Sequence, residues 1–224
     1  MYRKEALVEE EIYHIFNKSI AGFKIFNNET EYSRVISILR YYQIAKPLRF
    51  SDFVRFNRIN EDNLEGFIRG HLKDKEKIVE IIAYCIMPTH IHLILRQLKE
   101  KGISVFMSNV LNSYTRYFNT LHKRKGPLWE GRFKNVLVET DEQLLHLTRY
   151  IHLNPVTAYL ADRPGFWNFS SCKEYFLETN DDTVNKICNF TGLIDVTPVS
   201  YKMFVEDRIS YQRDLAKIKT LTLD

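Results

Sequence analysis

The sequence contains few of the residues that build linkers, disulfide frameworks or membrane spans. Its 224 residues include only 8 glycines and 6 prolines, so long flexible linkers are not expected. Its 3 cysteines are an odd number without close spacing, which argues against a disulfide framework and favours small buried side chains in a reducing compartment. No stretch approaches the roughly 20 consecutive apolar residues of a membrane span, and the first residues lack the apolar segment of a signal peptide. We therefore expect a soluble, cytoplasmic protein with no membrane partner.

Neither sign of charge dominates the chain. The 32 lysines and arginines exceed the 28 aspartates and glutamates, giving a formal net charge of +4. This mild excess is compatible with an anionic partner but does not establish one. Hydrophobic residues make up 45% of the chain and aromatic residues 13%, which is enough for one large domain or for one domain with an appendage.

Hydrophobic periodicity predicts an alternation of strands and helices along the chain. The expected strands are residues 12–20, 77–87, 90–97 and 133–140, and the expected helices are residues 27–45, 104–125 and 141–153. The polar stretch 46–77 predicts an insertion with one or two short helices. The last of the three helices is expected to stop before Pro155, because the residue preceding a proline disfavours helical geometry.

The resulting order, β-α-β-β-α-β followed by one further helix, is typical of the ferredoxin-like fold. We therefore predict an α+β protein with an antiparallel sheet, like that of RNA-recognition domains, and helices on one face of the sheet. The predicted main domain covers residues 1–161 and includes the insertion at about 46–77. A helical C-terminal tail is predicted at 162–224.

The stretch CIMPTHIHLIL, residues 85–95, places two histidines one residue apart in an apolar strand. Since alternate residues of a strand share a face, His90 and His92 stand side by side, while Ile91 and Leu93 point to the other face. Two imidazoles on a stiff support can bind one cation, including zinc or manganese. The alternative is that the histidines only satisfy hydrogen bonds at the edge of a sheet.

The predicted helix that follows the fourth strand offers a second set of polar groups. His146, Tyr150 and Asn154 follow an i, i+4, i+8 line on the flank of its apolar stripe. Tyr150 would then face a cleft, and Asn154, one turn away, could act as a third metal ligand. The alternative is that Tyr150 is a boundary aromatic residue and Asn154 a helix C-cap.

The stretch HKRKGPLWEGRFK, residues 122–134, interleaves basic and aromatic residues. Basic side chains contact phosphates, and aromatic rings stack on unpaired bases. The candidate nucleic-acid-binding residues of this stretch are Lys123, Arg124, Lys125, Trp129, Arg132 and Lys134. The alternative is a solvated loop that Trp129 anchors to the core, and both descriptions can hold at once.

A cation, a tyrosine and a basic loop together suggest chemistry on a phosphodiester. A cation held by imidazoles polarises a phosphate oxygen and favours the phenolate of a tyrosine, whose pKa is ordinarily about 10. Attack by that phenolate gives a phosphotyrosyl intermediate without consuming water, so an incoming hydroxyl can reverse the step. Cutting and rejoining nucleic acid strands is the natural use of such a reaction. Tyr114 and Tyr117 also lie near the basic loop, and spacing alone does not exclude them as nucleophiles.

Four motifs stand in the order MPTHIHLIL, SYTRYFN, GPLWEGRF and RYIHLNPV. Over residues 12–160 this order resembles the single-tyrosine transposases of the HUH (His-hydrophobic-His) type, and most closely the REP-associated tyrosine transposases. The resemblance implies a ferredoxin-like fold and a divalent metal ion, Mg²⁺ or Mn²⁺, held by His90 and His92. It also implies that Tyr150 is the catalytic nucleophile and Asn154 a further ligand. Thr89 departs from the asparagine that is common before the first histidine.

The resemblance further implies single-stranded DNA, folded into a short hairpin, as the substrate. Cleavage would leave a 5′-phosphotyrosine and a free 3′-hydroxyl, and Arg116 and Arg149 would help the basic loop to hold the DNA backbone. The insertion contains RFSDFVRFNRIN, which favours a surface for hairpin DNA, with a helical cap over the sheet edge as the alternative. Monomer and homodimer both stay open, although the short connection before the tyrosine helix favours an active site within one chain.

Other functions fit parts of the pattern. A catalytically inactive, domesticated relative would bind single-stranded nucleic acid without cutting it. An RNA-recognition module would stack bases on sheet aromatics, but here the strand face carries His90 and His92 instead. A metal-dependent hydrolase would cleave without a covalent adduct, and Tyr150→Phe would then leave cleavage largely intact.

Overall fold

The computed structural model describes residues 6–60, 63–177 and 186–214. Its strands are β1 (Ile12–Lys18), β2 (Val79–Met87), β3 (His90–Gln97) and β4 (Lys134–Val138). Its α-helices are α1 (Glu29–Tyr41), α2 (Phe50–Phe56), α3 (Leu64–Leu72), α4 (Gly102–Leu121), α5 (Asp141–Thr157), α6 (Cys172–Tyr175) and α7 (Pro198–Glu206). Within these residues, no helix combines the length and the apolar character needed to cross a membrane.

The four strands form one antiparallel sheet in the order β2-β3-β1-β4. The sequence order β-α-β-β-α-β and this strand order together make the ferredoxin-like fold, as predicted. The two central strands, β1 and β3, are paired so that Phe16 lies opposite His92. On the other side of β3, His92 lies opposite Cys85 of β2.

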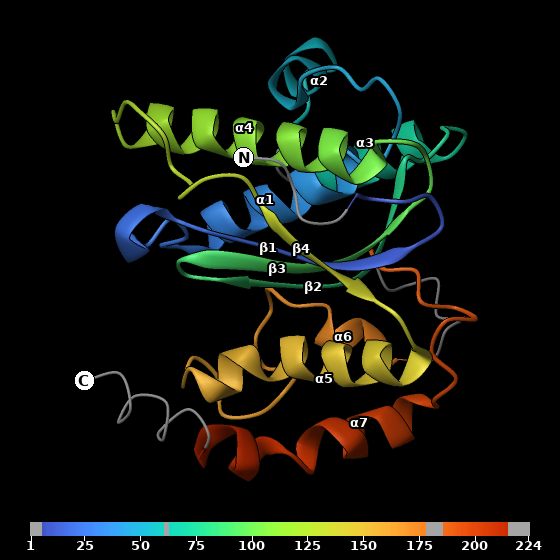
Figure 1. Cartoon of the computed structure of the whole chain (residues 1–224). Helices are drawn as coiled ribbons and strands as arrows, with labels where there is room; N and C mark the ends of the chain where they lie inside the picture. The colour runs from blue at the N-terminus through green and yellow to red at the C-terminus, as the bar shows by residue number, and fades with distance from the viewer. Residues whose placement is uncertain (1–5, 61–62, 178–185, 215–224) are drawn as a thin grey trace.

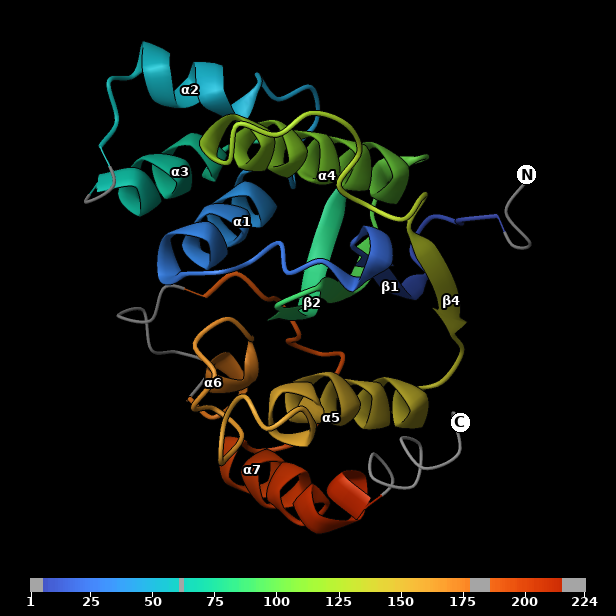
Figure 2. The same ribbon diagram turned by 90° about the vertical axis from the view of Figure 1, so that its left-hand side faces the viewer.

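Helices α1 and α4 cover one face of the sheet (Figure 1). Their apolar stripes bury Val35 and Phe106 against Ile15 of β1 and Leu93 of β3, all inaccessible to solvent. Helices α2 and α3 form the predicted insertion and lie beyond α1 on the same side of the sheet (Figure 2). The side chains of this insertion that join the main core are Phe50, Phe53, Ile59 and Ile68. The insertion therefore caps the helical layer, and its role as a DNA surface stays a prediction.

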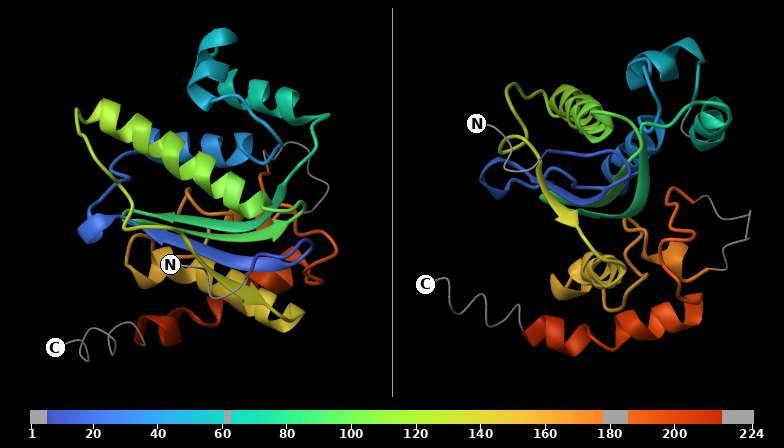
Figure 3. Two further views of the ribbon diagram at one scale, coloured as in Figure 1. Left: turned by 45° about the horizontal axis from the view of Figure 1, so that its top comes forward. Right: turned by 45° about the vertical axis from the view of Figure 1, so that its right-hand side comes forward.

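The opposite face of the sheet is covered by a second helical layer, α5 to α7, so the sheet lies between two layers (Figures 1 and 3). Leu144 and Ile151 of α5 are buried with Ile82 and Ile94 of the sheet. The helices predicted after residue 162 are present as α6 and α7, while the described residues 158–171 and 186–197 form no helix. Tyr175 donates a hydrogen bond to the Ile82 carbonyl at 2.7 Å, so the tail is tied to β2.

Helix α5 continues through Pro155 to Thr157, so the prediction that it stops before the proline is wrong. The alternative role of Asn154 as a C-cap is wrong too, because the cap is Ala158, whose N–H bonds to the Asn154 carbonyl at 2.9 Å. A proline inside a helix loses one backbone hydrogen bond. Burial of the last turn opposes that loss, since Leu153, Pro155 and Val156 are all buried.

His152 of α5 makes a buried polar contact between this helix and the tail. Its side chain is 1% exposed, its Nδ1 lies 2.8 Å from the Tyr201 hydroxyl, and its Nε2 lies 2.8 Å from the Ser171 hydroxyl. Because both ring nitrogens are paired, the imidazole can be buried without an unsatisfied polar atom.

We predict that His152→Ala lowers the free energy of unfolding by about 2–4 kcal/mol, because it leaves a cavity and removes the imidazole that bonds to the Tyr201 and Ser171 hydroxyls. The matched control is His146→Ala on the exposed flank of the same helix. This substitution is expected to change the free energy of unfolding by less than about 0.5 kcal/mol. Urea unfolding followed by circular dichroism measures both. Equal losses in the two variants would contradict the role assigned to His152.

Candidate active site

The strand β3 presents His90 and His92 to the face covered by α5, as their spacing predicts. The hairpin between β2 and β3 turns at Pro88 and Thr89, since Met87 pairs with His90. The two imidazole rings lie 5.0 Å apart between centroids and are nearly perpendicular, at 87°. Ile91 and Leu93 are fully buried on the opposite face, where α1 and α4 pack.

Both imidazoles are held through Nδ1. His90 Nδ1 lies 2.9 Å from the Thr89 hydroxyl, and His92 Nδ1 lies 3.0 Å from Nε2 of His14. Among the described residues, no hydrogen bond reaches the Nε2 atom of either ring. Each histidine thus offers one nitrogen to a ligand while a neighbour fixes its ring through the other nitrogen.

Burial keeps both imidazoles neutral near pH 7. It lowers the pKa of His90, with a smaller contribution from Lys18, and it lowers the pKa of His92 to about 3, with smaller contributions from His90 and His14. Neutral imidazole is the form that binds a cation, because the ligating nitrogen must carry a free lone pair.

His14 is a residue of this site that the sequence analysis missed. It lies on β1, and its ring stacks on His92 at 5.3 Å between centroids and 19° between planes. The ring of Phe16 lies 5.0 Å from that of His14. The available signal was the alternation in IYHIFNK, which places His14, Phe16 and Lys18 on one face, but the pairing register with β3 cannot be derived from it.

Tyr150 lies beside the histidines of its own chain. Because Leu144 and Ile151 hold α5 against the sheet, the Tyr150 ring reaches 6.1 Å from the His92 ring, nearly perpendicular at 86°. The side chain is 43% exposed, and its hydroxyl makes no hydrogen bond to the described residues. Burial raises the pKa of Tyr150, with a smaller contribution from Cys85, so the isolated protein holds a protonated phenol there.

Asn154 lies one helical turn after Tyr150. Its Nδ2 atom is buried and has no hydrogen-bond partner among the described residues. An unpaired buried amide is costly, and such groups call for a partner such as water or an ion. The amide can turn so that its oxygen takes the place of this nitrogen.

The structure separates the other candidate tyrosines from the histidines. Tyr114 is fully buried in the α1/α4 core, where its hydroxyl donates to the Ile25 carbonyl. The Tyr117 ring lies 5.1 Å from the Arg34 guanidinium, also on the α4 side of the sheet. The choice of Tyr150, which spacing alone left open, is therefore favoured by position.

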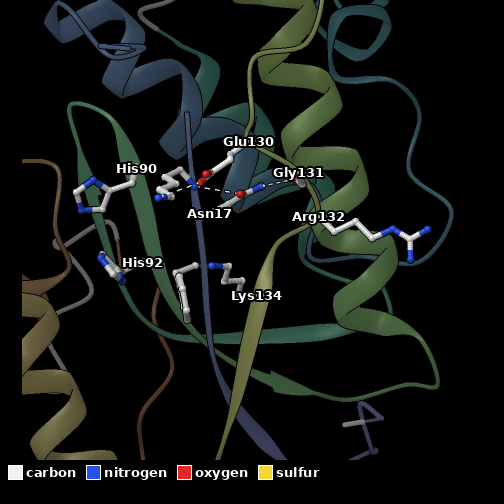
Figure 4. Close-up of a pocket in the computed structure, with 9 residues that line it drawn as sticks. Asn17, His90, His92, Glu130, Gly131, Arg132 and Lys134 are labelled. Atoms are coloured by element: carbon white, nitrogen blue, oxygen red, sulfur yellow. Dashed lines mark hydrogen bonds and ion pairs between the residues drawn. The ribbon is translucent and has the colours of Figure 1, made fainter. Parts of the chain in front are cut away.

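A cavity of about 420 Å³ lies beside the histidines, between β1, β3 and the segment that leads into β4 (Figure 4). Asn17 fixes one wall by donating to the Gly131 carbonyl at 3.2 Å. Lys18 and Glu130 form an ion pair of 3.1 Å on the same wall, and both are more than half exposed. The cavity is therefore open to solvent and carries charges of both signs.

The predicted basic residues fall into two groups. Arg132 and Lys134 line the histidine cavity, although Figure 4 shows that the Arg132 side chain extends away from His90 and His92. The other group surrounds a separate hollow of about 560 Å³ at the end of α4 and consists of Arg116, Lys123, Arg124 and Lys125. Within it, Arg124 already donates to the Pro127 carbonyl at 2.8 Å and holds the loop.

Two residues predicted to bind nucleic acid, Trp129 and Arg149, instead make packing contacts within the fold. Trp129 is only 8% exposed and packs in the core, where its Nε1 donates to the Leu111 carbonyl at 3.3 Å. Trp129 therefore anchors the loop to the core, which was the alternative to base stacking. A buried ring does not fit the prediction that Trp129 stacks on bases. Arg149 lies over the Phe204 ring of the α7 helix at 3.9 Å, so its guanidinium holds the tail rather than facing the cavity.

Comparisons with known proteins match the region that contains the site. The family model for IS200-like transposases matches residues 53–154, which include His90, His92, Tyr150 and Asn154. A protein named as a REP-associated tyrosine transposase, from Haemophilus influenzae, is 29% identical over 103 residues. This match covers 41% of the present chain and 58% of the relative. These matches confirm the resemblance drawn from the motifs.

Two solved structures are also similar. One, a REP-associated tyrosine transposase bound to a REP hairpin, is 15% identical with a TM-score of 0.49 and covers 78% of this chain and 83% of its own. Another, a transposase of Deinococcus radiodurans R1, is 16% identical with a TM-score of 0.36 and covers 67% of this chain and 95% of its own.

The different settings of the Tyr114 and Tyr150 hydroxyls predict effects of different size on stability. Tyr114→Phe is expected to lower the free energy of unfolding by about 1–3 kcal/mol, because the Ile25 carbonyl loses its donor in the core. Tyr150→Phe removes a hydroxyl without a protein partner and is expected to change it by less than about 0.5 kcal/mol. Urea unfolding of both variants measures this. A large loss in Tyr150→Phe would give that hydroxyl a structural role instead.

Proposed function

We propose that this chain is a single-tyrosine transposase that cleaves and rejoins single-stranded DNA through a covalent bond to Tyr150. The observation that carries the proposal is the position of the Tyr150 ring, 6.1 Å from that of His92 and open to solvent on one side. The similarity to IS200-like transposases over the same residues supports it. The tyrosine and the histidine pair of one chain already lie together, which supports catalysis in cis.

The polar groups at the site fit a divalent metal ion such as Mg²⁺ or Mn²⁺. Nε2 of His90 and Nε2 of His92 are available, and the Asn154 amide has no partner among the described residues. We propose that these three side chains hold the ion, with Asn154 turned to present its oxygen. When bound, the ion supplies positive charge that stabilises the phenolate of Tyr150 and a phosphate oxygen.

In the proposed cleavage step, the Tyr150 oxygen loses its proton and attacks the phosphorus of a phosphodiester. A bond forms between the tyrosine oxygen and phosphorus, and the bond between phosphorus and the 3′-oxygen breaks. The 3′-oxygen leaves and takes up a proton, which yields a 5′-phosphotyrosine and a free 3′-hydroxyl. No water is consumed, so another 3′-hydroxyl can attack the phosphotyrosine and join a new strand.

The proposed substrate is single-stranded DNA with a short hairpin. The hairpin rests on the sequence resemblance to REP-associated transposases. Arg132 and Lys134 at the cavity, and the basic residues at the end of α4, provide two sites for phosphates. A location in the cytoplasm stays a prediction.

The coverage of the sheet argues against a simple RNA-recognition module. Such a module stacks bases on the open face of its sheet. Here α5 packs Leu144 and Ile151 onto that face, beside the histidines. A domesticated protein that only binds DNA would retain the fold, and adduct formation separates it from a transposase.

The direct test incubates the protein with end-labelled single-stranded hairpin oligonucleotides and Mn²⁺, then searches for a covalent adduct on a denaturing gel. We expect an adduct that requires the metal and disappears in Tyr150→Phe and in His90→Ala. The matched control is Tyr159→Phe, since Tyr159 is 61% exposed just after α5 and should be dispensable. Cleavage without any adduct would support a hydrolase, and binding without cleavage would support a domesticated protein.

The two basic groups can be separated by the salt dependence of DNA binding. The slope of log K against log salt is negative, and each lost phosphate contact makes it less steep by about 0.7 for single strands. We expect Lys134→Ala and Lys125→Ala each to make the slope less steep by about that amount. The control is Lys99→Ala, an exposed residue just after β3 at the end away from His90. Titrations with a labelled oligonucleotide measure it, and an unchanged slope would remove that residue from the DNA surface.

A further inference from the structure

We propose that His14 is a positioning residue that fixes the ring and the tautomer of His92 for binding a divalent cation. This inference rests on the proposed function, because it concerns the cation that His90 and His92 would share. His14 lies on β1, a different strand from the histidine pair, and it is not part of the HxH motif.

The contact between the two rings is both directional and close. His14 Nε2 lies 3.0 Å from His92 Nδ1, and the rings are stacked at 19°. Phe16, directly opposite His92 in the sheet, lies 5.0 Å from the His14 ring and 6.1 Å from the His92 ring. The His14 ring is therefore held in place by an aromatic neighbour on its own strand.

The positions of the protons on the two rings determine which nitrogen donates in this hydrogen bond. A hydrogen bond between two neutral imidazole nitrogens needs one donor and one acceptor. A cation on Nε2 of His92 requires that nitrogen to be free of its proton, so the proton must reside on Nδ1. His92 Nδ1 then donates to His14 Nε2, and His14 carries its own proton on Nδ1. The arrangement selects the tautomer of His92 that leaves Nε2 ready to bind.

Thr89 plays the corresponding part for His90, with its hydroxyl 2.9 Å from Nδ1. A hydroxyl both donates and accepts, so it tolerates either tautomer of His90. His14 offers a single acceptor nitrogen to His92 and imposes one tautomer once its own proton is on Nδ1. The partner of His92 is thus His14, which β1 supplies through its pairing with β3.

The test measures Mn²⁺ affinity of the full chain by electron paramagnetic resonance of the free ion. Outer partners of ligating histidines commonly contribute a factor of about 10–100 in metal affinity, and we expect a loss of this size in His14→Ala. In His14→Gln a side-chain oxygen lies near the position of Nε2, so we expect most of the affinity to return. His71→Ala removes a histidine of α3, on the other side of the sheet, and should bind like the unmodified chain.

The outcomes separate this inference from the proposed function. Unchanged affinity in His14→Ala, together with a loss in His92→Ala, would overturn the role of His14 alone. Absence of Mn²⁺ binding by the unmodified chain would contradict the proposed metal site and, with it, this inference. Nitrogen-15 NMR of the imidazoles supplies a second readout without metal, in which His92 should carry its proton on Nδ1. A proton on Nε2 of His92 in the unmodified chain would overturn the proposal even if His14→Ala failed to fold.

Discussion

The pairing of β3 with its two neighbours is the constraint on which the rest of the structure depends. Because β3 lies between β1 and β2, its alternating side chains must satisfy two different layers at once. Ile91 and Leu93 enter the core beneath α1 and α4, and this fixes His90 and His92 on the opposite face. A slip of one residue would bury the imidazoles and expose the leucine and isoleucine, so the hydrophobic core holds the histidine pair in register.

The second layer turns this histidine face into a site. Helix α5 packs on the sheet through Leu144 and Ile151, and its position is secured by His152, which bonds to Ser171 and Tyr201 of the tail. The exposed flank of the same helix carries Tyr150 to the His92 ring. The tail thus contributes to the site indirectly, by holding the tyrosine helix in place rather than by lining the cavity.

Features set by local patterns could be predicted from the sequence, and features set by distant partners could not. The alternation in HIHLILRQ and the apolar stripe of α4 gave the histidine face and the ferredoxin-like order correctly. The continuation of α5 through Pro155 was missed, because burial of that turn depends on tertiary contacts. The burial of Trp129 and the contact of His14 with His92 depend likewise on which segments become neighbours. The tyrosine was chosen by resemblance, and the structure adds its proximity to His92.

The central claim is that Tyr150 becomes covalently bound to DNA at a site shared with the histidines of the same chain. The most direct measurement is peptide mapping by mass spectrometry after reaction with a single-stranded hairpin oligonucleotide and Mn²⁺, followed by nuclease treatment. The account predicts a nucleotide attached through phosphate to Tyr150, assigned by fragmentation of the tryptic peptide of residues 150–173, which also contains Tyr159 and spans the trypsin-resistant Arg163–Pro164 bond. A nucleotide on Tyr117 or Tyr159, or cleaved DNA with every tyrosine unmodified, would contradict it.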